Sequence, residues 1–129
     1  MQAKHFIMAL RLIKIVNDSK PEGEYVMLKA TEAINLAGYA LADRTFSDEV
    51  ISNDFRHVYF FPNMEVDKDD FIVVYTKTKA VGKGKTNNDN PCHYLSWGVD
   101  TCVWNDEGGD TVSLFQYIRV QAKNVPAVE

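Results

Sequence analysis

The segment from Tyr94 to Phe115 constrains the fold more than any other part of this chain. It holds both tryptophans, Trp97 and Trp104, and three of the seven glycines. Its order is an aromatic strand, a short turn, a second strand with a tryptophan, an acidic glycine turn and an alternating strand. Short strands separated by turn residues are typical of antiparallel sheets. The segment therefore predicts a β-sandwich, and it says more about fold than about function.

Length and composition indicate one domain over residues 1–129, with its core between about residues 8 and 123. The chain is 46% hydrophobic and has a formal net charge of −4, which disfavours nucleic-acid binding by the whole surface. The apolar run from Phe6 to Leu10 is too short for a signal peptide. No stretch approaches the ~20 apolar residues of a membrane span. We therefore expect a cytoplasmic protein without a membrane span.

Turn residues about every ten positions divide the rest of the chain into eight or nine short strands. This spacing predicts an all-β, immunoglobulin-like β-sandwich. The parity of apolar residues changes near Leu12 and Ile13, which predicts a bulge in the first strand. Residues 44–55 are expected to be irregular, and 77–91 to form the longest loop. Predicted strands cover Phe6–Val16, Glu24–Ala30, Ile34–Asp43, Arg56–Phe61, Phe71–Thr76, two stretches around the tryptophans, the alternating stretch that ends at Phe115, and Tyr117–Lys123.

Alternation within these strands also predicts which side chains are buried. The large apolar residues that share one parity are expected to fill the core, and both tryptophans are expected to pack there rather than to bind a ligand. The predicted core residues are Val26, Leu28, Leu36, Leu41, Val73, Tyr75, Trp97, Trp104 and Leu114.

Three blocks of the chain resemble the lamin tail domain family, and they run over about residues 10–122. The family's Pro-Gly turn is replaced here by Asp67–Asp70. The resemblance implies an immunoglobulin-like β-sandwich that serves as an interaction module, without catalytic residues or a cofactor. The matching blocks are Glu24–Lys29 with Ile34–Asp43; Tyr59–Pro62 with Val66 and Phe71–Thr76; and Trp97, Trp104, Asn105, Gly108 and Asp110–Leu114.

The most basic stretch is the best candidate for a binding site. Four lysines, Lys77, Lys79, Lys83 and Lys85, fall within nine residues that contain no acid. Together they could contact phosphates through the salt-dependent release of counterions. The alternative is that they keep an exposed sheet edge soluble.

Cysteines, histidines and acids suggest no metal or catalytic site. Cys92 and Cys102 are expected about 13 Å apart, beyond the ~7 Å that a disulfide tolerates, so both should be free thiols. Cys92 and His93 are neighbours in a strand and must point to opposite faces, which argues against a shared zinc site or a Cys-His pair. The acids Asp100, Asp106, Glu107 and Asp110 fit solvated turns better than a calcium loop. We expect no cofactor.

These observations lead to one main expectation and one alternative. The chain is expected to be a non-enzymatic interaction module that binds a protein partner or itself. The alternative is binding of nucleic acid or another polyanion through the stretch from Lys77 to Lys85.

Overall fold

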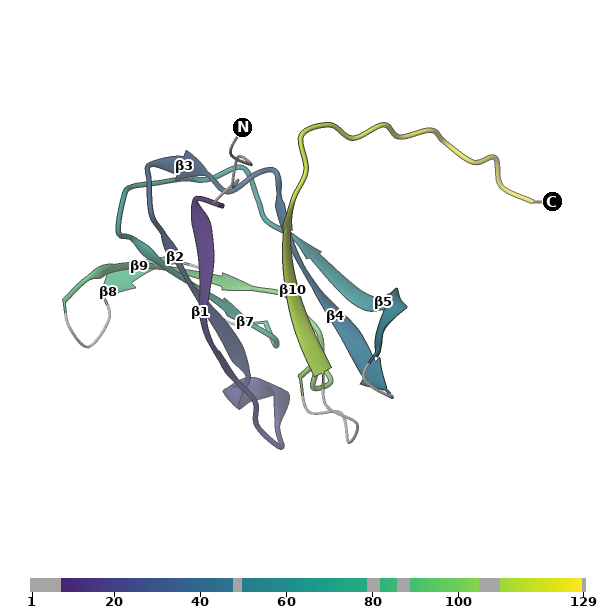
Figure 1. Ribbon diagram of the computed structural model, residues 1–129, viewed down its shortest axis with the longest axis horizontal. Coiled ribbons are helices and arrows are strands. Elements are labelled where there is room, and N and C mark those ends of the chain that lie inside the picture. Colours follow the sequence, from purple (N-terminus) through teal and green to yellow (C-terminus); the bar gives the residue numbers. More distant parts are fainter. Residues whose placement is uncertain (1–7, 48–49, 79–81, 86–88, 105–109, 129) are drawn as a thin grey trace, which may run out of the picture.

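The computed structural model describes residues 8–47, 50–78, 82–85, 89–104 and 110–128. These residues form ten strands and one short 3-10 turn (Figure 1). The elements are β1 (Leu10–Val16), the 3-10 turn (Pro21–Gly23), β2 (Tyr25–Ala30), β3 (Ile34–Asn35), β4 (Tyr39–Ser47), β5 (Val50–Phe60), β6 (Glu65–Val66), β7 (Phe71–Tyr75), β8 (Gly82–Lys85), β9 (Pro91–Ser96) and β10 (Asp110–Gln116). The prediction of an all-β chain is confirmed.

The strands form two main sheets and one small one. The larger sheet has the order β1-β2-β7-β9-β8, the second has the order β10-β4-β5, and β3 pairs with β6. Neighbouring strands are antiparallel except β7 and β9, which run parallel. Figure 1 shows the five-stranded sheet on one side of the molecule and the β10-β4-β5 sheet on the other. The described part of the chain contains no helix long and apolar enough to cross a membrane.

Alternation along β2 sorts side chains between an inner and an outer face. Val26, Leu28 and Ala30 are buried, whereas Tyr25, Met27 and Lys29 are only half-buried. The inner residues belong to one apolar cluster that also contains Tyr39 and Leu41 of β4. The core therefore lies between the two main sheets, and the outer face of the five-stranded sheet is a separate surface.

Seven of the nine predicted core residues lie in this cluster or against it. Val26, Leu28, Leu36, Leu41 and Trp104 are buried members, and Trp97 and Leu114 are partly buried and pack against them.

The other two predicted core residues occupy the outer face of β7. Val73 is buried but pairs with Met27, and half-buried Tyr75 pairs with Tyr25. Val73 is thus a buried core residue, as predicted, whereas Tyr75 is only half-buried. Strand β7 is apolar on both parities, so periodicity alone does not tell its two faces apart.

Two irregular features of the backbone agree with the sequence. The register between β1 and β2 shifts between Leu12 and Lys14, which confirms the predicted bulge. Gly38 has φ +100° and precedes β4. A Cβ at Gly38 would lie 3.2 Å from the carbonyl oxygen of Tyr117. Glycine is favoured here because other residues rarely adopt this conformation.

Several predicted segments were wrong in ways that have a physical cause. Residues 44–47 and 50–55 continue β4 and β5 rather than forming irregular structure. The expected long loop contains β8, since its Gly-Lys-Gly-Lys sequence supplies backbone partners for β9 despite poor intrinsic strand propensity. The stretch from Trp97 to Trp104 is not a strand, and its backbone bonds to groups of other segments instead.

The last predicted strand, Tyr117–Lys123, is also absent. Strand β10 ends at Gln116, which lies opposite Tyr39, the first residue of β4. Beyond that point β4 offers no further strand to pair with. The amide of Tyr117 still donates to the carbonyl of Gly38 at 2.7 Å, and the chain then leaves the sheet (Figure 1).

Candidate functional site

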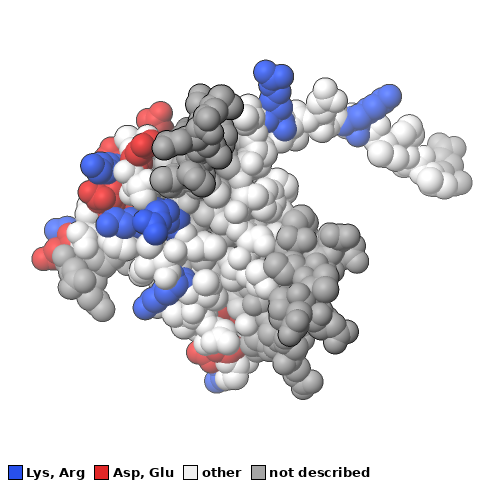
Figure 2. Space-filling model, viewed as in Figure 1, with Lys and Arg blue, Asp and Glu red and all other residues white. Residues whose placement is uncertain are grey.

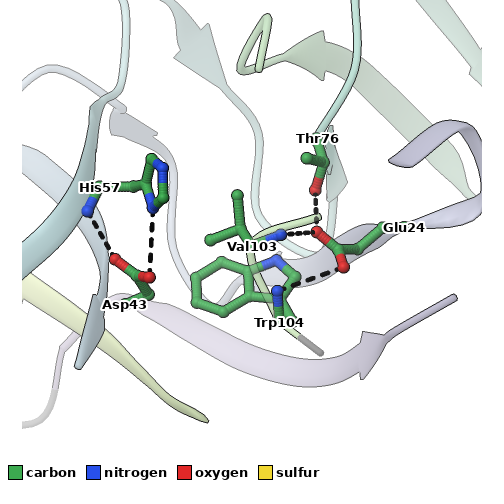
Figure 3. Close-up of polar contacts among 6 residues, drawn as sticks. All are labelled: Glu24, Asp43, His57, Thr76, Val103 and Trp104. Carbon is green, nitrogen blue, oxygen red and sulfur yellow. Dashed lines mark hydrogen bonds and ion pairs between the residues drawn. The ribbon is translucent and has the colours of Figure 1, made fainter. Parts of the chain in front are cut away.

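A fully buried carboxylate, Glu24, holds the segment from Trp97 to Trp104, which we call the tryptophan loop, against the five-stranded sheet (Figure 3). Its Oε1 accepts hydrogen bonds from the Thr76 hydroxyl and the Val103 amide, each at 2.7 Å. Its Oε2 accepts one from the Trp104 amide at 3.2 Å. A buried carboxylate bonded to three donors is satisfied where it stands, so Glu24 has a structural role.

Two histidine–aspartate pairs are also tied to the framework. Buried Asp43 accepts from the His57 amide at 2.6 Å, and its other oxygen lies 3.2 Å from the His57 ring Nδ1 (Figure 3). This pair spans the place where the β4–β5 register shifts after Ala42. It bridges a local irregularity of the sheet.

The second pair is Asp70 and His93, with Oδ2 and Nε2 separated by 2.9 Å in a buried position. Burial by itself would raise the pKa of Asp70, but hydrogen bonds from His93 and from the Asp67 amide hold that pKa below its usual value. His93 lies opposite Ile72 on the inner face, and Cys92 lies on the outer face. The expectation that Cys92 and His93 point to opposite faces is confirmed.

Both cysteines are free thiols, as predicted. Burial raises the pKa of Cys92 and of Cys102, so both thiols stay protonated near neutral pH and are weak nucleophiles. Among the described residues, no three His, Cys, Asp or Glu side chains are grouped so as to hold a metal ion. Of the acids proposed for a calcium loop, Asp106 and Glu107 lie outside the described residues.

Three of the four lysines of the predicted anion site lie among the described residues, in different surroundings. Lys77 is paired with Glu22 at 2.9 Å, and this hydrogen bond raises the pKa of Lys77. Lys83 lies opposite His93 in the β8–β9 register. Lys85 ends β8, and Lys79 lies outside the described residues. The structure thus divides the predicted set between different surroundings.

Lys85 instead belongs to a surface on the outer face of the five-stranded sheet, which we call the tyrosine face. Its three rings come from three adjacent strands: Tyr25 on β2, Tyr75 on β7 and Tyr94 on β9. The registers place Tyr25 opposite Tyr75, and Val73 opposite Tyr94. The face encloses a shallow concavity of about 190 Å³ lined by Lys14, Tyr25, Met27, Val73, Tyr75, Lys85, Cys92 and Tyr94.

The rings of the tyrosine face contact each other in a continuous row. The centroids of Tyr75 and Tyr94 are 6.1 Å apart and their planes differ by only 12°. The ring of Tyr25 meets Tyr75 edge-on at 5.9 Å. Burial is the main cause that raises the pKa of Tyr75 and Tyr94, so both hydroxyls are neutral at neutral pH. The row is an uncharged aromatic floor.

A glycine makes room for the last ring of this row. A Cβ built on Gly84 of β8 would lie 2.9 Å from Cε2 of Tyr94, closer than real side chains approach. The Tyr94 hydroxyl donates to the carbonyl of Lys85 at 3.2 Å, which holds the ring in this place. Gly84 is therefore needed for the present position of Tyr94, a role that the sequence did not indicate.

Positive charge borders the tyrosine face. The Lys14 ammonium lies 5.8 Å from the centroid of Tyr25, within the range of a cation–π contact. Lys85 lines the concavity with Lys14, and no carboxylate of the described residues lines it. Lys29 lies on the same face of β2, over Phe71, and is 3.7 Å from Asp69. Figure 2 shows blue side chains grouped over the region of β1 and β2.

The second unusual surface is the C-terminal segment, residues 118–128. It extends away from both sheets (Figure 1). Within the described chain, none of its backbone groups is hydrogen-bonded to another segment. Four large apolar side chains are open to water: Ile118 at 92%, Val120 at 69%, Val125 at 88% and Val128 at 99% exposed.

Sequence reasoning missed both surfaces, although a signal for each was present. Tyr25 and Tyr75 lie in predicted strands, but nothing in their spacing says that the described residues place no second sheet over the outer face of β7. The alternation of Ile118 and Val120 predicts a paired strand, which the structure does not form. Both errors have the same origin: periodicity shows which residues share a face, and only tertiary structure shows what covers it.

No known protein family matches the chain, and no curated protein matches it either.

Proposed function

We propose that this chain is a non-enzymatic interaction module that binds a protein partner through its C-terminal segment. The proposal rests on one observation: residues 118–128 are extended, have no partner strand in the described chain and expose four large apolar side chains. Exposed apolar side chains gathered on one segment mark interaction sites. An extended segment with free backbone groups can add as a strand to the sheet edge of another protein.

The alternation of the segment suits strand addition. Ile118 and Val120 share one parity, whereas Arg119 and Gln121 share the other. In a paired strand the two aliphatic side chains would therefore pack on one face of the partner, with the polar ones on the other. Arg119 and Lys123 make the segment basic, which favours a partner with acidic groups beside its exposed edge.

Among the described residues, the titratable groups are held in structural contacts, which fits a binding role. Glu24 is fully engaged with backbone and hydroxyl donors. Each histidine–aspartate pair joins neighbouring strands, and the thiols are protonated. An active site needs titratable groups that converge on one open pocket, and the tyrosine face offers rings and lysines instead.

We also propose that the two sheets form an immunoglobulin-like β-sandwich of lamin-tail type. Two features support this: the core between the five-stranded and three-stranded sheets, and the three sequence blocks that resemble the family.

The test compares two double variants of the full chain as bait in a lysate of the native host. Ile118→Asp with Val120→Asp places two charges on the apolar side of the segment. Gln121→Asp with Asn124→Asp adds the same two charges without removing an apolar side chain. We expect a protein that survives nuclease and high salt to bind the wild type and the control variant, and to be lost from the Ile118/Val120 variant.

Self-association is measured with the same variants by size-exclusion chromatography with light scattering. A wild-type dimer that dissociates only in the Ile118/Val120 variant would identify a second copy as the partner. Equal retention of bound protein by the wild type and both variants would contradict a role for the C-terminal segment.

A further inference from the structure

We propose that the tyrosine face is a second binding site, and that its ligand is single-stranded nucleic acid. This site is separate from the C-terminal segment and does not depend on its role. The inference rests on three features of the face: a row of ring surfaces, lysines at its border, and a glycine that keeps one ring accessible.

The rings offer stacking surfaces at the outside of a sheet. Tyr25, Tyr75 and Tyr94 lie on three adjacent strands, with centroids 5.9 and 6.1 Å apart. The planes of Tyr75 and Tyr94 are close to parallel, and the two rings stack on each other. Bases of any sequence can stack on such aromatic surfaces.

The lysines supply positive charge where phosphates would lie. Lys14 and Lys85 line the concavity, and its described lining contains no acidic residue. The chain as a whole is acidic, with a formal net charge of −4, so this local composition differs from the rest of the molecule. Lys29, on the same face, lies 3.7 Å from the Asp69 carboxylate, which is outside the concavity. An anionic ligand is thus favoured here, and cationic ligands are not.

Nucleic acid suits this face better than an acidic peptide does. A peptide that adds to a sheet needs free backbone groups at an edge, but β2, β7 and β9 are interior strands with partners on both sides. A peptide bound by its side chains needs deep pockets, and this concavity is shallow. The face offers ring surfaces and ammonium groups, which match bases and phosphates.

The ligand should be single-stranded. In a duplex the bases are stacked on each other and their surfaces do not reach a flat aromatic floor. Unpaired bases can be splayed out and stacked on side chains. We therefore expect preference for single strands with little dependence on sequence.

The first experiment measures binding of a fluorescein-labelled dT12 oligonucleotide by fluorescence anisotropy at low and rising salt. Tyr75→Leu removes one ring but keeps an apolar side chain, and should weaken binding by about tenfold, within the range for the loss of one stacked base. Lys14→Gln should weaken binding less, and should reduce the salt dependence, d log K/d log [salt], by about 0.7. Lys20→Gln, outside the face, is the matched control and should behave as the wild type.

The second experiment uses two glycines of the same edge strand. Gly84→Ala would push the Tyr94 ring out of its place, because the new Cβ meets Cε2 at 2.9 Å. Gly82→Ala meets nothing within 4 Å. We expect weaker dT12 binding by the Gly84 variant alone, with the circular dichroism spectra of both variants unchanged.

Three outcomes would overturn the proposal. The first is no dT12 binding by the wild type at low salt. The second is binding that Tyr75→Leu and Gly84→Ala leave unchanged, since this would show that the lysines attract polyanions without stacking. The third is duplex DNA or polyglutamate binding as tightly as dT12. None of these results bears on protein binding by the C-terminal segment.

Discussion

The molecule contains two groups of aromatic side chains that have opposite relations to water. Between the sheets, Trp97 and Trp104 lie 5.7 Å apart, and Tyr59 packs on Trp97 at 5.6 Å. On the outer face of the five-stranded sheet, Tyr75 and Tyr94 lie at a similar distance, 6.1 Å. Ring spacing alone does not separate a core from a binding surface.

The polar neighbours of each group make the difference. Beside the tryptophans, the Glu24 carboxylate accepts hydrogen bonds from two backbone amides of the tryptophan loop. Burial raises the pKa of Tyr59 to about 12. Beside the tyrosines, the Lys14 ammonium lies over the Tyr25 ring, and Lys14 and Lys85 both line the concavity. The tryptophans thus lie in the core beside a fully hydrogen-bonded carboxylate, although Trp104 Nε1 is itself buried without a hydrogen-bond partner among the described residues, whereas the tyrosines lie beside two lysines.

The largest effect is expected in the tryptophan group. Trp104→Ala should lower the free energy of unfolding by roughly 3–5 kcal/mol, because it leaves a large cavity between the sheets. Urea denaturation followed by circular dichroism measures this change. A loss below about 1 kcal/mol, typical of surface positions, would mean that Trp104 is not a core residue.

The second largest loss of unfolding free energy is expected on removal of the Glu24 carboxylate, which holds the tryptophan loop. Glu24→Ala leaves the Thr76 hydroxyl and the amides of Val103 and Trp104 without their acceptor, and should cost roughly 2–4 kcal/mol of unfolding free energy. The same denaturation assay applies, with exposed Glu32→Ala as the control. A loss no larger than that of the control would show that water replaces the carboxylate.

We expect part of the loss of folding stability at low pH to come from protonation of Asp70. Its pKa in the folded protein lies below the ordinary 3.8, so its contribution to stability is complete above about pH 4 and is lost as the pH falls through the folded-state pKa. Asp70→Asn should remove this part of the acid dependence, measured as thermal midpoints between pH 2 and 5. Exposed Asp69→Asn should retain it, and an unchanged acid profile in the Asp70 variant would exclude this pair as its source.

The smallest effect on stability is expected at the tyrosine face. Tyr75→Leu should change the free energy of unfolding by no more than about 1 kcal/mol, since the side chain is half-exposed and stays apolar. Together with the loss of oligonucleotide binding, this would separate a binding residue from a core residue. A loss as large as that of Trp104→Ala would show that the two aromatic groups have the same role.

The sequence predicted local structure well wherever one face of a strand is buried and the other is polar. The alternation in β2 and the bulge of β1 follow from side-chain pattern alone, and the structure shows both. The sequence was a poor guide where backbone pairing decides the outcome: β8 forms from glycine and lysine because β9 needs a partner, and Tyr117–Lys123 stays unpaired because β4 has already ended. The alternation of apolar and polar residues does not show which strand edges pair with each other.

The candidate sites were harder to predict for a related reason. Lys77, Lys83 and Lys85 are close in sequence, but Lys77 is ion-paired with Glu22, whereas Lys83 and Lys85 lie in edge strand β8. The tyrosine face joins Lys14, Tyr25, Tyr75 and Tyr94, which are spread over eighty residues. Such a surface depends on the order of strands in the sheet, and the sequence does not state that order.

The buried position of Glu24 also affects how the chain reaches its native state. Two of its donors, Val103 and Trp104, are 79 and 80 residues away along the chain. In a partly folded form that contains only β2 and its neighbouring strands, burial would desolvate this carboxylate without its hydrogen-bond donors. Desolvation of an unpaired charge is strongly unfavourable. Partly assembled forms are therefore penalised, and formation of the first sheet is coupled to arrival of the distant loop. The result is folding close to all-or-none.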